Sequence, residues 1–135
     1  MRFEGRVWKD GKFWLVEVPM LDLMTQGRSR KEALAMIVDA IESLTDQKGF
    51  RAMVYGLAGE SIEVGSSDTA TLTALMLRRQ REAHGLSLAE VSKRLGQSSR
   101  NAYARYEQGA SVPTVDKLQK LLSIVTGRDF VLKPA

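Results

Sequence analysis

The sequence predicts an α+β fold, with a β-rich layer in the first half of the chain and an all-α domain in the second. In the first half, a run of alternating apolar and polar residues and a second, largely apolar run flank an Asp-Gly pair, which is typical of a β-hairpin. In the second half, apolar residues recur every three or four positions, which predicts a series of short helices. We therefore expect two domains, at residues 1–66 and 67–135.

The charge distribution divides at nearly the same place. Residues 1–68 contain nine Lys and Arg against eleven Asp and Glu, a net charge of −2. Residues 69–135 contain eleven against five, a net charge of +6. Such an asymmetry indicates a different kind of partner for each half.

Composition excludes several classes of protein. The chain has 135 residues, of which 44% are hydrophobic and 27% charged, as in ordinary globular proteins. It has no cysteine, which excludes disulfides and thiolate metal sites and makes the cytoplasm the simplest expectation. No apolar run approaches the roughly 20 residues that span a bilayer, and the first residues do not have the pattern of a signal peptide. We expect no membrane association.

Two strands are expected at the start of the chain. Residues 2–9 and 13–18 flank Asp10-Gly11, a pair that tolerates the positive φ of a tight turn. The first strand alternates as a strand with one wet face does, whereas the second is apolar on both faces. We therefore expect the second strand to be central or covered on both sides, with a short third strand at residues 23–26.

A helix and further strands follow. Ser29 and Glu32 form a capping box, which opens a helix that runs to about Leu44. Its expected buried stripe is Leu34, Ile37, Val38, Ile41 and Leu44. Residues 50–55 are expected to form a strand and residues 61–64 a short one. The order is that of a small β-β-β-α-β layer.

The second half contains a pattern of helix, tight turn and helix. Ser87 and Glu90 form a second capping box, and Gly96 stands where a helix end needs positive φ. The next helix, at residues 100–107, is polar and basic. This arrangement predicts a DNA-binding helix-turn-helix, whose second helix enters the major groove.

The segment from about Leu77 to Val125 resembles the Cro/repressor-like (XRE-type) helix-turn-helix domain. The matching residues are Arg81, Gly85-Leu86-Ser87, Val91, Leu95-Gly96, Tyr106-Glu107, Gly109 and Pro113, followed by a Leu-rich helix. The chain departs from that family at Leu88, where Gln is usual, and in a turn at residues 96–99 that is one residue longer than the common form.

The resemblance places the DNA-contacting side chains at the start and outer face of the second helix. The candidate DNA-binding residues are Ser98, Ser99, Arg100, Asn101 and Arg105. Arg can contact guanine with two donors, and Asn can pair with adenine. Tyr103 and Tyr106 occupy positions that pack in related domains, so we expect both in the core.

Other parts of the second half leave alternatives open. Arg78, Arg79 and Arg81, on a helix that starts near Thr69, either form a solvated face or contact the DNA backbone. A last helix starts at Pro113-Thr114 and ends at Gly127. The apolar residues 129–133 are expected to form a strand or an extended segment, docked on their own domain or on a second subunit.

The first half resembles the HicB-type antitoxin family of bacterial toxin–antitoxin pairs. The resemblance rests on Asp10-Gly11, Val18-Pro19, Thr25-Gln26-Gly27, Ser29 and Glu32-Ala33. It implies a truncated RNase H-like fold for the N-terminal domain and a DNA-binding C-terminal domain. It also implies a partner, a HicA-like toxin that is a small, basic ribonuclease cleaving mRNA.

The residues themselves do not indicate an enzyme. RNase H-like chemistry needs carboxylates that converge on divalent metal ions, and Glu4, Glu17 and Asp39 fit solvated positions better. His84, the only histidine, ends a helix, where a cation is favoured. We expect no catalytic residue, no metal site and no cofactor.

Two functions remain open from the sequence. The first is an antitoxin and autorepressor, which neutralises a HicA-like toxin through residues 1–66 and binds operator DNA through residues 67–135. The second is a stand-alone transcription regulator whose N-terminal domain senses a small molecule or only oligomerises. One helix-turn-helix contacts one half-site, so we expect a homodimer or a homotetramer in either case.

Overall fold

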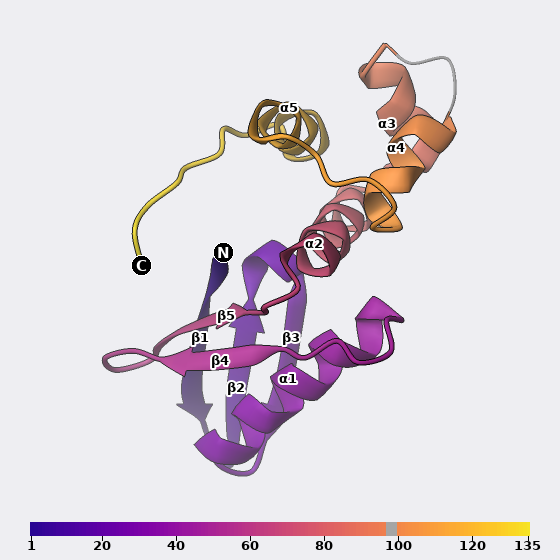
Figure 1. Cartoon of the computed structure of the whole chain (residues 1–135). Helices are drawn as coiled ribbons and strands as arrows, with labels where there is room; N and C mark the ends of the chain where they lie inside the picture. Colours follow the sequence, from indigo (N-terminus) through magenta and orange to yellow (C-terminus); the bar gives the residue numbers. More distant parts are fainter. Residues whose placement is uncertain (97–99) are drawn as a thin grey trace. The chain divides into compact units, whose positions relative to one another are not determined.

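The computed structural model describes residues 1–96 and 100–135. The chain consists of two compact units, Met1–Leu72 and Thr73–Ala135. The division falls inside helix α2, Thr69–Ala83, whose first turn belongs to the first unit. The first unit is built around a sheet and the second is helical (Figure 1), so the predicted α+β class is confirmed.

The first unit is a five-stranded antiparallel sheet with helix α1 against one face (Figure 1). The strands are β1 (Arg2–Asp10), β2 (Phe13–Val18), β3 (Leu23–Gly27), β4 (Met53–Gly56) and β5 (Ser61–Gly65), and α1 spans Arg30–Thr45. The order across the sheet is β3-β2-β1-β5-β4. A short 3-10 turn, Pro19–Leu21, connects β2 to β3.

The first hairpin turns one residue later than predicted. Asp10 pairs with Phe13, so Asp10 still belongs to β1 and the two-residue loop is Gly11-Lys12. Gly11 has φ 61°, a value that glycine adopts without steric cost. The turn therefore depends on the glycine of the Asp-Gly pair, and the aspartate acts as the last paired residue of the strand.

Strand β2 lies inside the sheet but is covered on one face only. It pairs with β1 on one side and β3 on the other, as expected of an interior strand. Val16 and Val18 are buried, whereas Phe13, on the opposite face, is 43% exposed. Of the two alternatives that the sequence left open, the interior position of β2 is confirmed. Coverage on both faces is not found, because α1 packs on a single face of the sheet.

The short strands at residues 23–26 and 61–64 are confirmed as β3 and β5. The first strand after α1 begins at Met53, three residues later than predicted, and Phe50 is buried in the connecting segment. Strand β5 lies between β4 and β1, where it pairs with β1 from Arg2 to Arg6. The predicted β-β-β-α-β layer is thus extended by a second hairpin.

Helix α1 begins after Ser29, as predicted, but only one of the two bonds of the predicted capping box is present. The Ser29 hydroxyl accepts a hydrogen bond from the Glu32 backbone N–H at 3.1 Å. The helix buries Ala33, Ile37 and Ile41 completely, while Leu34, Val38 and Leu44 are half-buried. The buried stripe is thus centred slightly to one side of the predicted one.

The second unit consists of α2 from Thr73 onward and three further helices, α3 (Leu88–Arg94), α4 (Arg100–Glu107) and α5 (Val115–Thr126). All four helices contribute buried hydrophobic residues, and Leu86 adds one just ahead of α3: Ala74, Leu75, Met76, Leu77, Leu86, Val91, Tyr103, Ala104, Leu121, Leu122 and Val125. Among the described helices, none is long and apolar enough to cross a membrane.

The start and the end of α5 are as predicted. The Thr114 hydroxyl accepts a hydrogen bond from the Lys117 N–H at 3.2 Å, and Gly127 ends the helix with φ 69°. Residues 129–133 were expected to form a strand or an extended segment. They form no helix or strand and belong to no sheet, so only the second alternative remains.

Candidate nucleic-acid interface

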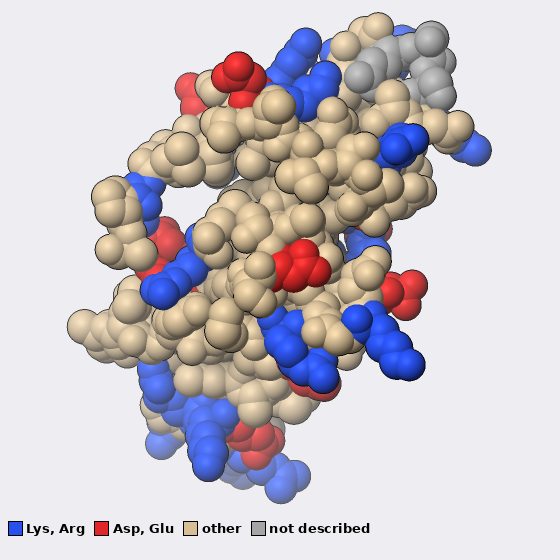
Figure 2. Space-filling model, in the orientation of Figure 1, with Lys and Arg blue, Asp and Glu red and all other residues tan. Residues whose placement is uncertain are grey.

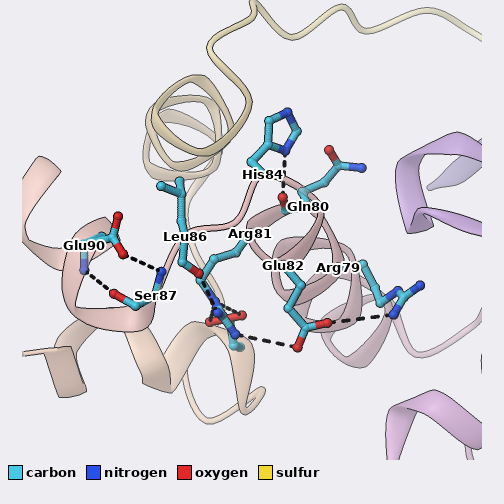
Figure 3. A network of polar contacts seen from close by, with 9 residues as sticks. Arg79, Gln80, Arg81, Glu82, His84, Leu86, Ser87 and Glu90 are labelled. Carbon is cyan, nitrogen blue, oxygen red and sulfur yellow. Dashed lines mark hydrogen bonds and ion pairs between the residues drawn. The ribbon is translucent and has the colours of Figure 1, made fainter.

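The first helix of the helix-turn-helix is capped as predicted. The Ser87 hydroxyl accepts a hydrogen bond from the Glu90 N–H at 3.0 Å, and the Glu90 carboxylate accepts one from the Ser87 N–H at 3.3 Å (Figure 3). These reciprocal bonds satisfy two N–H groups that a helix start leaves unpaired. The start of α3 is therefore determined by its own sequence.

The turn after α3 begins at a glycine. Leu95 is the C-cap, and Gly96 adopts φ 74°, which confirms the prediction for this position. Two of the candidate DNA-binding residues, Ser98 and Ser99, lie outside the described residues. The chain is described again from Arg100, where α4 begins.

A buried ion pair joins α2 to the end of α4. The Arg81 Nε donates to both carboxylate oxygens of Glu107, at 2.9 and 3.0 Å. The two side chains are only 14% and 6% exposed. Arg81 also donates from Nη1 to the Leu86 carbonyl oxygen at 2.8 Å, just ahead of α3 (Figure 3). One guanidinium therefore ties together α2, the start of α3 and α4.

This role for Arg81 corrects the sequence-based expectation. Arg81 neither forms a solvated face nor points outward for a phosphate, because its donors are used inside the unit. Both Arg81 and Glu107 belong to the XRE-type resemblance, but their separation of 26 residues gave no local signal of pairing. The only sign of the pairing in the sequence is that two residues of opposite charge, one on each helix, both belong to the residues that carry the resemblance.

The environment of the pair changes the ionisation of its members. Burial raises the pKa of Glu107, and the hydrogen bond and charge of Arg81 offset part of that effect. The same carboxylate contributes to the pKa of Tyr103, which is raised above its ordinary value mainly by burial. Tyr103 is fully buried, as predicted, and its hydroxyl has no hydrogen-bond partner among the described residues.

Helix α4 presents its polar side chains to solvent. Three of its polar residues are exposed: Arg100, Asn101 and Arg105. The opposite face of the helix buries Tyr103 and Ala104. Asn101 and Arg105 are one turn apart and so share a face. Arg100 stands at the first position of the helix and forms no hydrogen bond or ion pair with another described residue.

Two arginines near this face already contact their own domain. Arg105 Nε donates to the Ser111 hydroxyl at 3.4 Å, beyond the end of α4. Arg94, at the end of α3, donates from Nη1 to the Ile124 carbonyl oxygen at 3.5 Å. Both are held near the outer surface by one weak hydrogen bond each. Figure 2 shows Lys and Arg side chains at the surface of α3 and α4.

Two further groups, Arg79 on α2 and His84 just beyond its end, contact residues of α2. Arg79 lies 3.8 Å from the Glu82 carboxylate, and His84 Nδ1 lies 2.8 Å from the Gln80 carbonyl oxygen (Figure 3). His84 therefore contacts a carbonyl of the last turn of its helix, as expected of a helix-end histidine. Tyr106 is half-buried, so the prediction that it lies in the core is only partly confirmed.

No group of three or more acidic or histidine side chains is arranged to hold a metal ion in the part of the chain that is described. Of the three acidic candidates from the sequence, Glu4 and Asp39 are exposed and Glu17 is half-buried.

Comparison with known proteins agrees with this geometry. Residues 77–124 match the model of a helix-turn-helix family, from the second half of α2 to the last turn of α5. Comparison with curated proteins finds no match. The matched segment contains the capped α3, the Arg81–Glu107 pair and the exposed face of α4. The second unit is therefore a helix-turn-helix domain of the kind found in DNA-binding transcription regulators.

Proposed function

We propose that the chain is an antitoxin that also represses its own operon. The helix-turn-helix domain binds operator DNA, and the sheet unit binds a small, basic, HicA-like toxin. The observation that carries the DNA-binding part is the match of residues 77–124 to the helix-turn-helix family. The antitoxin part is supported by the resemblance of the first half to HicB-type antitoxins and by the chemistry of the open sheet face.

The proposed DNA contacts follow from the geometry of α4. Arg100 and Asn101 are in the first turn of the helix, and side chains in that turn contact base edges when a recognition helix enters the major groove. Arg105, one turn later, reaches a base or a phosphate. Ser98 and Ser99 complete the proposed contact set. The net charge of +6 on residues 69–135 supplies the attraction to phosphates that positions the domain.

The open sheet face is the proposed toxin-binding surface. This face is the side of the sheet turned away from the buried Val7, Val16 and Val64. By the pairing register its apolar residues are Trp8, Phe13, Leu15, Met24, Met53 and Tyr55. Phe13, Met24 and Met53 are 41–56% exposed. Several exposed apolar side chains on one face are typical of a protein-binding surface.

The charges of this face favour a basic partner. Arg2 and Arg6 stack over Tyr55 and Trp8, at 3.5 and 4.4 Å from the ring centroids. Each of the two also forms an ion pair, with Glu63 at 3.1 Å and with Glu60 at 2.7 Å. The positive charges of the face are thus engaged within the unit, whose net charge is −2 over residues 1–68. A small basic protein is complementary to such a surface.

The proposal predicts that a small basic protein is encoded beside the gene of this chain, and the experiment uses that protein together with the full chain. Expression of that neighbour alone should arrest growth, and co-expression of the chain should restore it. Met24→Arg should abolish the rescue, because it places a positive charge on the open sheet face. Met36→Arg is the matched control, since Met36 is a similarly exposed methionine (42%) on α1. Both variants should bind DNA as the parent chain does.

The outcomes distinguish the two functions that the sequence leaves open. A neighbouring protein that does not arrest growth contradicts the antitoxin proposal. A rescue that survives Met24→Arg contradicts the proposed toxin-binding surface. If the neighbour is not toxic and the chain still binds specifically to the DNA upstream of its own gene, the alternative function, a stand-alone transcription regulator, is supported.

A further inference from the structure

Two residues of opposite charge, Arg6 and Glu17, stand directly across from each other on the open sheet face but do not bond to each other. Arg6 Nε instead donates to the Glu60 carboxylate at 2.7 Å, and its guanidinium lies over the Trp8 ring at 4.4 Å from the centroid. Opposite charges that face each other in an antiparallel pair normally attract. Arg6 is therefore held away from its acidic neighbour in the ladder.

Glu17 has no polar partner within the part of the chain that the structure describes. It is half-buried, and its surroundings on the sheet are largely apolar. Its neighbour on β3 is Met24, and Leu15 lies two residues away on the same face of β2. Burying a carboxylate among such side chains is costly unless it is paired with a cation. A protein that covers this part of the face is therefore expected to bring a positive charge to Glu17.

The position of Glu60 explains why Arg6 leaves Glu17 available. The Val7 N–H donates to the Glu60 carbonyl oxygen at 2.8 Å, so the backbone of Glu60 is fixed beside β1, next to Arg6. The two charged side chains of the Arg6–Glu60 pair are 51% and 55% exposed. An exposed ion pair is weak by itself, and the stacking of Arg6 on Trp8 adds to it. Glu60 thus acts as a positioning residue for Arg6.

We propose that Glu17 anchors the toxin on the open sheet face by pairing with one lysine or arginine side chain of that basic partner, and that Glu60 keeps Arg6 from occupying the same carboxylate. This inference rests on the proposed function, because it needs a basic protein on this face. A charge pair enclosed by apolar side chains that exclude water has the character of an interface hot spot. Loss of one member of such a pair mainly accelerates dissociation, whereas loss of a charge at the rim mainly slows association.

The first test measures how fast the full chain associates with, and dissociates from, the small basic protein encoded beside its gene. Surface plasmon resonance at one fixed salt concentration gives both rates. Glu17→Gln should raise the dissociation constant about thirtyfold or more, mainly through faster dissociation, because the cation of the partner is left buried and unpaired. Glu17→Asp retains the charge and should keep most of the affinity.

Asp10→Asn is the matched control for Glu17→Gln. Asp10 lies on the same face, opposite Phe13 at the exposed end of β1, so the substitution removes the same charge from the rim of the surface. It should slow association slightly and change the dissociation constant less than about fivefold. The tryptophan emission of each variant, from Trp8 and Trp14, verifies that the first unit is folded.

The second test releases Arg6 from its present partner. In Glu60→Gln, Arg6 can turn to Glu17 across the ladder and neutralise it, so binding of the basic protein should weaken about tenfold. In the double variant Glu60→Gln/Glu17→Gln no carboxylate is left at position 17 for Arg6 to occupy. The affinity of the double variant should therefore equal that of Glu17→Gln alone.

The measured rates distinguish the outcomes. Faster dissociation of Glu17→Gln, together with equal affinities of Glu17→Gln and the double variant, supports the inference. A Glu17→Gln variant that dissociates as slowly as the parent chain overturns the anchor, while binding by the parent chain leaves the antitoxin proposal standing. Losses of affinity that add in the double variant overturn the positioning role of Glu60. A parent chain that does not bind the basic protein overturns both the proposed function and this inference.

Discussion

At the scale of single residues, the Arg81–Glu107 pair decides how the DNA-facing helix is held. One N–H of the Arg81 guanidinium is shared between the two carboxylate oxygens of Glu107, and the pair is almost excluded from solvent. A second nitrogen of the same guanidinium donates to the Leu86 carbonyl oxygen. Removing one member of such a pair leaves an uncompensated charge inside the domain, which costs more than the intact pair contributes. The pair therefore maintains the relative placement of α2 and α4 within the second unit.

Glu107→Gln should lower the free energy of unfolding by about 3 kcal/mol, because the amide cannot neutralise the buried Arg81. Glu82→Gln is the control: Glu82 lies 3.8 Å from Arg81 but is 47% exposed, so its loss should cost under about 1 kcal/mol. Urea denaturation followed by far-UV circular dichroism measures both. Equal decreases in the free energy of unfolding for the two variants would show that burial does not strengthen the interaction between Glu107 and Arg81.

A second prediction at this scale concerns Asp68, which caps α2. Its carboxylate accepts hydrogen bonds from the Thr71 hydroxyl at 2.6 Å and the Thr71 N–H at 3.0 Å. These bonds lower the pKa of Asp68 below its ordinary value. A lowered pKa means that the stabilisation is complete above the ordinary value of about 3.9 and is lost as the pH falls through the folded-state value.

Asp68→Ala should therefore cost about 1 kcal/mol at neutral pH, the typical value of an N-cap, and less at about pH 3. Thr114→Ala removes a neutral cap from α5 and serves as the control, since its cost should not change with pH. Thermal unfolding of the three proteins at both pH values provides the comparison. A cost for Asp68→Ala that is the same at both values would contradict the charge dependence of this cap.

At the scale of elements, the contact between β3 and the start of α1 depends on a glycine. A Cβ at Gly27 would lie 2.8 Å from the Glu32 carbonyl carbon and 2.9 Å from the Ala33 Cα, both of them backbone atoms. Backbone in the first turn of a capped helix cannot move aside without disturbing the cap. Gly27 thus permits the helix to approach the sheet closely enough to bury Ala33.

Gly27→Ala should destabilise the first unit by about 1–3 kcal/mol through overpacking. Gly56→Ala is the matched control, because Gly56 is also in a strand and its added Cβ would meet only the flexible Arg30 side chain, at 3.6 Å. Both tryptophans, Trp8 and Trp14, belong to the first unit, so tryptophan fluorescence during urea denaturation follows its unfolding. If Gly56→Ala destabilised the first unit as much as Gly27→Ala, the close approach of α1 to Gly27 would not explain the effect.

At the scale of the whole molecule, the two units are proposed to bind different partners. The net charges of the two halves of the chain have opposite signs, and the open sheet face and α4 belong to different units. Substitutions on one unit should therefore leave the binding function of the other unchanged. This separation can be tested with variants of the full chain, since no fragment is needed.

Arg100→Ala should weaken binding to the specific operator by about 1–3 kcal/mol and relax base preference at one position, because it removes a bidentate contact to a base. Arg94→Ala, on α3, should at most weaken binding evenly on all sequences through a phosphate contact. Titration of operator and scrambled DNA at one fixed salt concentration separates the two effects. Equal losses on both DNAs for Arg100→Ala would show that Arg100 contacts only the backbone, and neither variant should affect toxin neutralisation.

Features that depend only on neighbouring residues could be predicted from the sequence. The serine caps of α1 and α3, the hairpin at Gly11 and the positive φ at Gly96 involve groups only a few residues apart, so their hydrogen bonds and backbone preferences are local. The pattern of the helix-turn-helix is built from such features, which is why its place in the chain was predictable. The buried position of Tyr103 followed from the same pattern.

Features that join residues far apart in the chain could not be predicted from the sequence, because they depend on how the elements pack. The place of β5 between β1 and β4 depends on backbone pairing between strands far apart in the chain, which no local pattern records. The Arg81–Glu107 bond required two helices to meet, so Arg81 looked like a surface cation until its burial was known. Phe13 looked like a covered residue because a strand pattern shows which side chains alternate, whereas the packing of α1 decides which face is buried.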